Sequence, residues 1–240
     1  MPNQGNSTLA TYADDTLLLA RNHDLAAAIT DLQDATTYMS HWYTKWNLVP
    51  NFDKTKTKIF SLRRIRPQTD ITLNGTQIRW LNSDEPLRYL GADLDTRLTY
   101  RQHTNRRLTL AYTRLTQLYP LLNRRTPLKT DCTILLYKSL LRPLLTYACP
   151  VWFGASSSVK RKLEVFQNKV LRMAVGAPWF VRNEQIRAEL GVDSLEDHLK
   201  QLTLRHLGNL PLYPAAEDFN LGMATAHPRL KPRLSQDLLL

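Results

Sequence analysis

The periodicity of the apolar residues changes near residue 97, and this change limits the folds that the chain can adopt. Before it, one long helical pattern at residues 23–47 is accompanied by short runs typical of strands. After it, apolar residues recur at helical spacing in residues 108–122, 130–147, 163–173, 182–190 and 194–209. We therefore expect an α+β chain: residues 1–97 form an antiparallel sheet with a packed helix, residues 98–210 an all-α bundle, and residues 211–240 a loosely ordered tail.

The helix predicted at residues 23–47 has an apolar face along one side. We expect Asn22 to cap its N-terminus and Pro50 to stop it. Trp42 and Trp46 continue the face and are expected in the core. The residues of the face recur at alternating spacings of four and three: Leu25, Ile29, Leu32, Thr36, Met39, Tyr43 and Trp46.

Short strands are predicted on both sides of this helix. Residues 8–12 and 17–20 are two apolar runs separated by a bend. Further strands are expected at 56–62, 70–75 and 76–81, with Asn74-Gly75 as a hairpin turn. Residues 87–95 are expected to form one strand broken by a glycine.

The basic charge lies in the second part of the chain. Residues 1–97 carry 11 lysines and arginines and 11 acidic residues, whereas residues 98–182 carry 15 basic residues against only Asp131 and Glu164, a net charge of +13. Such an asymmetry indicates a polyanionic partner for the second part. The alternative is an ordinary solvated basic helix surface.

Several classes of protein are not favoured. No apolar run is long enough to cross a membrane, and residues 1–10 do not resemble a signal peptide. Cys132 and Cys149 are isolated, and the six histidines lack metal-ligand spacing. We therefore expect an intracellular protein of the nucleus or cytoplasm.

Asp14 and Asp15 stand at the bend between the first two strands. Aspartate is a common turn residue, so the pair could be an ordinary acidic turn. However, two-residue hairpins prefer Gly or Asn, and the bend offers neither. The flanks are apolar enough to be buried, which would place two like charges at the edge of a core unless a cation compensates them. Both interpretations remain open from the residues alone.

Several segments, taken in order, resemble the reverse transcriptases of non-LTR retrotransposons of the jockey and LINE type. "TLATYADDTLLLA" resembles the Tyr/Phe-Ala-Asp-Asp hairpin of the polymerase palm, and "NLVPNFDKTKTKIF" a downstream lysine motif. "LRYLGADLD" resembles the primer-grip segment. "SLLRPLLTYACPVWFGASSS" and "LEVFQNKVLRMAVGAPWFVRN" resemble the thumb that follows. The resemblance covers roughly residues 8–210 and implies a partial palm followed by a helical thumb.

The resemblance implies an RNA-directed DNA polymerase that acts on an RNA template, a DNA primer and dNTPs. Nucleotidyl transfer of this kind uses two Mg²⁺ ions, which favour oxygen ligands. Asp14 would be a direct metal ligand and Asp15 a supporting carboxylate. Tyr12 would lie beside nucleic acid or nucleotide, although a strand aromatic could equally belong to the core.

The resemblance also gives roles to residues downstream. Lys54 would face the incoming triphosphate, although alternating lysines also guard exposed strand edges against aggregation. Tyr89, Leu90 and Gly91 would form the primer grip, whereas an ordinary strand with a bulge is the alternative. Phosphate contacts are expected from three basic groups, each member of which could also be a solvated surface charge: Arg106-Arg107, Arg124-Arg125 and Lys160-Arg161-Lys162.

One departure from the family pattern affects the expected activity. Reverse transcriptases hold another metal-binding aspartate in a strand well upstream of the Tyr-Ala-Asp-Asp hairpin, whereas the eleven residues before Tyr12 contain no Asp or Glu. The fingers and the first catalytic strand have no counterpart either. We therefore expect this chain to be a C-terminal palm and thumb fragment with little or no polymerase activity alone. The alternative is a non-enzymatic nucleic-acid-binding remnant.

Overall fold

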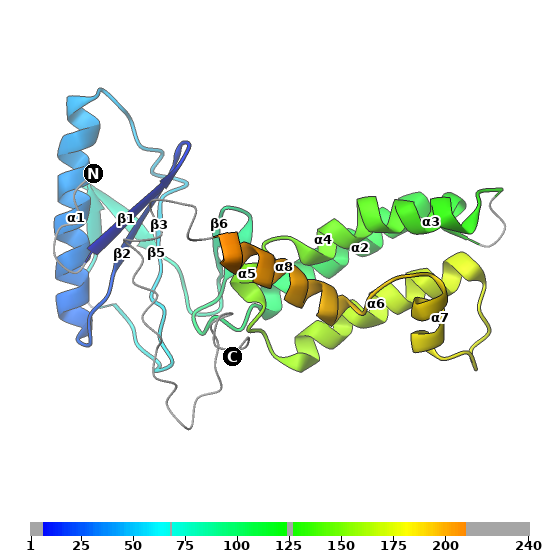
Figure 1. The fold of residues 1–240 in the computed structure, drawn as a ribbon. Helices are drawn as coiled ribbons and strands as arrows, with labels where there is room; N and C mark the ends of the chain where they lie inside the picture. The colour runs from blue at the N-terminus through cyan, green and yellow to red at the C-terminus, as the bar shows by residue number, and fades with distance from the viewer. Residues whose placement is uncertain (1–6, 68, 124–126, 210–240) are drawn as a thin grey trace. The chain divides into compact units, whose positions relative to one another are not determined.

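The computed structural model describes residues 7–67, 69–123 and 127–209 (Figure 1). The chain divides into two compact units, residues 1–98 and 99–240. Arg124 and Arg125, as well as the tail predicted at 211–240, lie outside the described residues. Each unit is described by itself below.

The first unit combines short sheets with one long helix. Strands β1 (Ser7–Tyr12) and β2 (Asp15–Ala20) form an antiparallel hairpin. Strand β5 (Thr76–Trp80) lies between β3 (Lys56–Thr57), to which it is parallel, and β4 (Ile71–Leu73), to which it is antiparallel. Strands β6 (Leu87–Tyr89) and β7 (Ala92–Leu94) form a second small hairpin.

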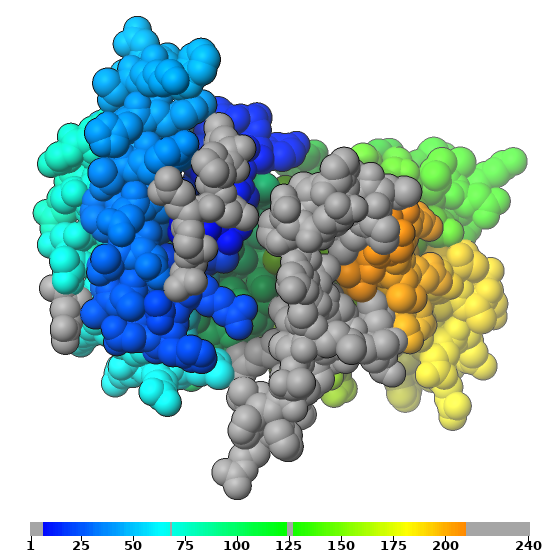
Figure 2. Space-filling model, turned by 60° about the vertical axis from the view of Figure 1, so that its left-hand side comes forward, coloured from blue at the N-terminus to red at the C-terminus, as the bar shows by residue number. Residues whose placement is uncertain are grey.

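Helix α1 (Leu25–Lys45) supplies one apolar face of the core of this unit (Figure 1). It packs against β2 and β4. Its other side forms much of the surface of this unit seen in Figure 2. The buried centre consists of Ile29 from the helix and Ile71, Leu73 and Ile78 from the sheet. The sequence periodicity of the helix thus corresponds to a real core.

The ends of α1 differ from the prediction. Asp24, not Asn22, caps the N-terminus, because its carboxylate accepts a hydrogen bond from the Ala27 N–H at 3.0 Å. Asn22 instead accepts a bond from the Asp24 N–H at 3.2 Å. The helix ends at Lys45, well before Pro50, and Asn47 has a positive φ of 52°. Trp46 therefore leaves the helical face and is 60% exposed rather than part of the core.

The predicted strands also need correction in three places. The described strands form three separate small sheets rather than one antiparallel sheet, and β3 pairs with β5 in parallel. Only Lys56 and Thr57 of the segment 56–62 form a strand. Residues 87–95 form a hairpin rather than one broken strand, because Leu90 and Gly91, with φ of 44° and 75°, turn the chain back. The predicted turn at Asn74-Gly75 is confirmed, with φ of 50° and 76°.

Every regular element described in the second unit is helical. The α+β class expected from the sequence is therefore confirmed. The helices are α2 (Arg101–Leu122), α3 (Thr130–Leu136), the π-helical turn η1 (Tyr137–Leu141), α4 (Arg142–Thr146), α5 (Cys149–Trp152), α6 (Ser157–Val175), α7 (Asn183–Glu189) and α8 (Leu195–Asn209). Across the described parts of both units, no helix has the length and apolar character that a membrane crossing requires.

The segment 130–146 stays helical across Pro143. Proline lacks the N–H that an α-helix needs and its ring clashes with the preceding turn. The π-helical turn η1 comes directly before α4, which carries Pro143 in its first turn. The wider turn provides the local adjustment that such a proline requires.

The core of the second unit lies between α2, α6 and the helices that follow. Helix α6 packs against α2, α3, α7 and α8. Its predicted face is buried at Leu163, Phe166 and Val170. On α2, Ala111, Leu115 and Leu122 occupy the buried side, and Tyr119 is 54% exposed.

A polar pair sits within this core. The buried Tyr137 hydroxyl donates a hydrogen bond to Gln167 Oε1 at 2.5 Å, and Gln167 Nε2 donates to the Asp193 carbonyl at 2.9 Å. Burial raises the pKa of Tyr137 strongly; the positive charge of Arg142 opposes this shift, and the negative charge of Glu164 adds to it. The hydroxyl therefore stays protonated and joins η1, α6 and the loop before α8.

Candidate metal and nucleic-acid site

The acidic bend is the tip of the β1–β2 hairpin. Tyr12 and Asp15 are directly opposed across the two strands, so Ala13 and Asp14 form a two-residue turn. Ala13 takes a φ of 51°, the left-handed conformation for which the sequence offers no Gly or Asn. The turn thereby places Asp14 and Asp15 side by side at one end of a regular hairpin.

The surroundings of the tip differ from the sequence expectation. Tyr12 is 67% exposed, and Ala13, Asp14 and Asp15 are exposed as well. The apolar flank is only half-buried, and Leu19 is 48% exposed. The two carboxylates therefore face water rather than the edge of a core, and Tyr12 is not a core residue. The charges of Asp14 and Asp15 need no compensating group inside the protein, and the two carboxylates are accessible to a ligand.

The second small hairpin brings Tyr89 near this tip. Partial burial raises the pKa of Tyr89, and the negative charge of Asp15 raises it further. Tyr89 ends β6, and Leu90 and Gly91 form the turn that follows. The segment predicted as a primer grip and the acidic tip are therefore close in space within the first unit.

The carboxylate pair fits part of a magnesium site. Carboxylate oxygens are the protein ligands that Mg²⁺ prefers, and Mg²⁺ keeps water or substrate phosphates in its other positions. However, in the described part of the chain no three Asp, Glu, His or Cys side chains gather where they could hold an ion. Asp14 and Asp15 alone are too few to hold two ions.

Lys54 lies in a turn between α1 and the sheet. Its side chain is exposed, and its backbone N–H donates to Asn51 Oδ1 at 3.1 Å. The edge-guarding interpretation does not describe this residue, because it precedes the strand. That interpretation fits Lys56, which is exposed on β3 at the edge of the three-stranded sheet.

Lys58 has a structural role that the sequence did not single out. Its ammonium group donates to the backbone carbonyls of Asn82, at 2.6 Å, and Glu85, at 2.5 Å. Burial lowers its pKa, whereas the nearby charges of Asp84, Asp95 and Glu85 oppose that shift. Nothing in the run of alternating lysines distinguishes it, since the acceptors come from a loop far along the chain.

The basic residues predicted to contact phosphate fall into two kinds. Arg106 and Arg107 are half-buried on α2, and the Arg107 guanidinium lies 3.9 Å from the centre of the Tyr147 ring. Lys160 pairs with Glu196 at 2.7 Å and has a side chain only 13% exposed. These three cations have contacts within the unit.

Two further predicted cations lie on the surface of α6. Arg161 and Lys162 are exposed, and Lys162 Nζ lies 3.5 Å from Asn105 Oδ1 on α2. Among the described members of the basic groups, these two are exposed, whereas Arg106, Arg107 and Lys160 are half-buried. An aromatic loop at Trp179 and Phe180 was not expected from the sequence. The missed signal is two adjacent aromatics between Pro178 and an arginine at 182.

Comparison with known proteins relates nearly the whole chain to polymerases of mobile elements. It is 32% identical over 256 residues to the RNA-directed DNA polymerase from mobile element jockey of Drosophila funebris, a match that covers all of this chain and 28% of that protein. The jockey polymerase of Drosophila melanogaster is 31% identical over 226 residues, which cover 93% of this chain and 24% of that protein. A probable RNA-directed DNA polymerase from transposon X-element is 29% identical over 98% of the chain and 25% of its own length.

These relatives define the class. The homologues of this chain are RNA-directed DNA polymerases of mobile elements, and the chain corresponds to one segment of them. These relatives are polymerases of non-LTR retrotransposons, the group that the ordered motifs predicted. It spans about a quarter of the length of the curated relatives that it matches. No protein-family model and no solved structure matches it.

Proposed function

We propose that this chain is the palm and thumb segment of an RNA-directed DNA polymerase, with part of its catalytic centre at the β1–β2 hairpin. The observation that carries the proposal is the tight turn that presents Asp14 and Asp15 to solvent at the tip of a regular hairpin. An exposed acidic pair held by a regular hairpin is suited to metal ligation, because the strands fix its position before any ion binds.

In this proposal each side chain has a defined task. Asp14 ligates Mg²⁺ directly and Asp15 supports it. Bound Mg²⁺ would supply activation of the primer hydroxyl and stabilisation of the leaving pyrophosphate. Lys54, which is exposed, neutralises the triphosphate or donates a proton to pyrophosphate. Tyr89, Leu90 and Gly91 contact the primer, and Tyr12 lies beside the nucleotide or nucleic acid.

The second unit would hold the RNA template and DNA primer by their phosphates. The net charge of +13 in residues 98–182 supports this role, as do the exposed Arg161 and Lys162 on α6. Such contacts give affinity that falls steeply with salt and has no sequence preference.

The ligand count implies that the site is shared with another part of the polymerase. Two carboxylates are fewer than two octahedral ions require. We therefore expect little dNTP incorporation by the 240-residue chain alone.

A chimaeric polymerase tests the proposal directly. The segment of the Drosophila melanogaster jockey polymerase that matches this chain is replaced by residues 1–240. Template-directed dNTP incorporation is then measured with an RNA template, a DNA primer and Mg²⁺. We expect incorporation by the chimaera, and a loss of at least about 100-fold on Asp14→Asn. The matched control, Asp70→Asn, replaces an exposed aspartate of the same unit outside the hairpin and should leave the rate unchanged. Equal activity of the Asp14→Asn chimaera would contradict the proposal.

Nucleic-acid binding without catalysis is a second candidate function. The concentration of basic charge after residue 97 favours it independently of the aspartates. It predicts that the 240-residue chain binds a template–primer duplex equally well with and without Mg²⁺, and that Asp14→Asn leaves this binding intact. A chimaera that incorporates dNTPs would decide in favour of the polymerase.

A further inference from the structure

An exposed aromatic pair stands on the loop between α6 and α7. Trp179 is 89% exposed and Phe180 69%, the highest values among the large apolar side chains described in the second unit. Their rings pack edge to face, with centroids 6.1 Å apart. Two large aromatics that are this exposed leave apolar surface available to a partner.

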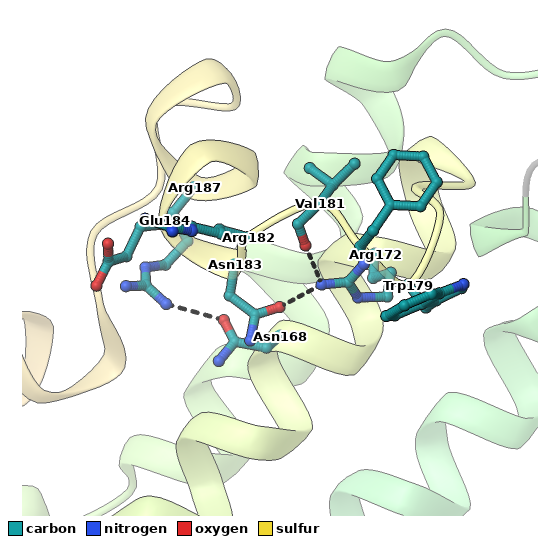
Figure 3. A pocket seen from close by; sticks show the side chains of 9 residues that line it. Asn168, Arg172, Trp179, Val181, Arg182, Asn183, Glu184 and Arg187 are labelled. Carbon is teal, nitrogen blue, oxygen red and sulfur yellow. Dashed lines mark hydrogen bonds between the residues drawn. The ribbon is translucent and has the colours of Figure 1, made fainter.

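Arg172 holds this loop in place. Its guanidinium donates hydrogen bonds to the carbonyls of Pro178, at 2.5 Å, and Val181, at 2.8 Å, and to Asn183 Oδ1 at 2.7 Å. Figure 3 shows Arg172 between Asn183 and Trp179. Gly176, with a φ of 61°, ends α6 and starts the loop. The aromatic pair is therefore presented on a fixed segment, which lowers the entropy lost when a ligand binds.

The loop carries positive charge that its own contacts do not neutralise. All three acceptors of Arg172 are neutral oxygens. Arg182 is exposed, and no ion pair within the described residues involves it. Arg187, by contrast, is paired with Glu164 at 3.0 Å. Among the described residues, the exposed Glu184 is the only carboxylate that lines the adjacent cavity of about 610 Å³.

We infer that this loop binds single-stranded nucleic acid, with unpaired bases stacked on Trp179 and Phe180 and a phosphate held by Arg182. Aromatic side chains beside cations are the combination that binds single strands without sequence choice. A duplex offers few free base faces, since its bases are already stacked on one another. The basic excess in residues 98–182 favours a polyanion over an apolar protein surface. This inference extends the proposed function, because it gives the second unit a contact to unpaired template in addition to duplex phosphates.

Binding of labelled oligonucleotides to the full chain tests the inference. Fluorescence anisotropy is measured with a single-stranded 12-mer, as DNA and as RNA, and with a blunt duplex of the same length. We expect W179A/F180A to weaken single-strand binding about tenfold or more, because stacking on each base contributes an affinity factor of about 5 to 150. Duplex binding should change by less than about twofold.

Matched variants separate stacking from charge and from misfolding. W46A removes an exposed tryptophan of the first unit and should change neither affinity. R182Q should lower the salt slope of single-strand binding by about 0.7, whereas R205Q, on the exposed surface of α8, should leave it unchanged. Trp179 fluorescence should be quenched on titration with the single strand, and the quenching should be absent in W179F.

The outcomes distinguish this inference from the proposed function. Unchanged single-strand binding by W179A/F180A overturns the inference, and the pair is then assigned to another partner such as protein. An equal loss for single strand and duplex overturns it as well. The result of the chimaera experiment does not depend on either of these binding outcomes, because dNTP incorporation depends on Asp14 and not on the loop between α6 and α7. A difference between the DNA and RNA arms identifies the strand that the loop holds.

Discussion

The negative charge of Asp15, at the tip of the β1–β2 hairpin, helps to raise the pKa of Tyr89, at the end of β6. The two residues belong to separate hairpins that no strand pairing joins. Their proximity brings two segments of the chain, "YADD" and "RYLG", into one neighbourhood. Because the charge of Asp15 acts on Tyr89, the pKa of Tyr89 should respond to a change of charge at the tip.

Substitution of Asp15 should lower the pKa of Tyr89. Asp15→Asn removes the negative charge that disfavours the phenolate, whereas the burial that raises the pKa remains. The pKa should therefore fall but stay above its ordinary value. NMR titration of ring-labelled tyrosine measures it, with the Tyr89 signal assigned from Tyr89→Phe. Asp34→Asn, in the middle of α1, is the control, and an equal shift in that variant would refute the relationship.

Lys54 and Lys56 should differ in their effect on catalysis by the chimaera. Lys54→Ala should lower kcat/KM for dNTP by about 10- to 100-fold, because a cation facing the triphosphate is lost. Lys56→Ala should leave it within about twofold, since that residue lies on the edge strand β3. Steady-state incorporation with varied dNTP measures both. Equal effects would remove the special role proposed for Lys54.

Leu90→Asn should stabilise the β6–β7 hairpin. Leu90 has a φ of 44°, so its backbone is strained in the left-handed conformation. Because it is 38% exposed, burial of its side chain offsets this strain only in part. Asparagine tolerates this conformation, and an Asn-Gly turn is favoured in a two-residue hairpin. We expect the free energy of opening of the hairpin amides to rise by about 1 kcal/mol, as measured by hydrogen–deuterium exchange of the full chain. Gly91→Ala, at a φ of 75°, should lower it; a rise there would contradict the strain argument.

Tyr137→Phe should destabilise the second unit by about 1–3 kcal/mol, because Gln167 Oε1 loses its buried donor. The difference should shrink above pH 10. In the folded protein burial raises the pKa of Tyr137, so the unfolded chain releases the proton first and wild-type stability falls as the pH rises. The free energy of unfolding of wild type should fall by up to about 1.4 kcal/mol per pH unit for this reason, whereas that of Tyr137→Phe should not.

Urea unfolding of the full chain at pH 8, 10 and 11 measures this change. Tyr119→Phe, on the exposed side of α2, is the matched control and should stay within about 0.5 kcal/mol of wild type at pH 8. A pH-independent difference between wild type and Tyr137→Phe would show that the buried hydroxyl does not resist ionisation.

Local sequence patterns, which involve residues only a few positions apart, were enough to predict several elements of this structure. The alternation of apolar runs predicted the first hairpin, Asn74-Gly75 predicted a turn, and the spacing of Leu163, Phe166 and Val170 predicted the buried face of α6. The ordered motifs also identified the family. These features are readable because turn preference and helical or strand period depend on local residues.

Only the tertiary structure decided which side chains are buried and which residues meet. Trp46 follows the period of α1 but lies past its end, and Lys58 looks like its neighbours until the loop at 82–85 places carbonyls around it. The charge effect of Asp15 on Tyr89 and the pair Tyr137–Gln167 likewise join residues far apart in the chain. Such contacts depend on how the elements pack, and packing is set by the whole unit rather than by any short segment.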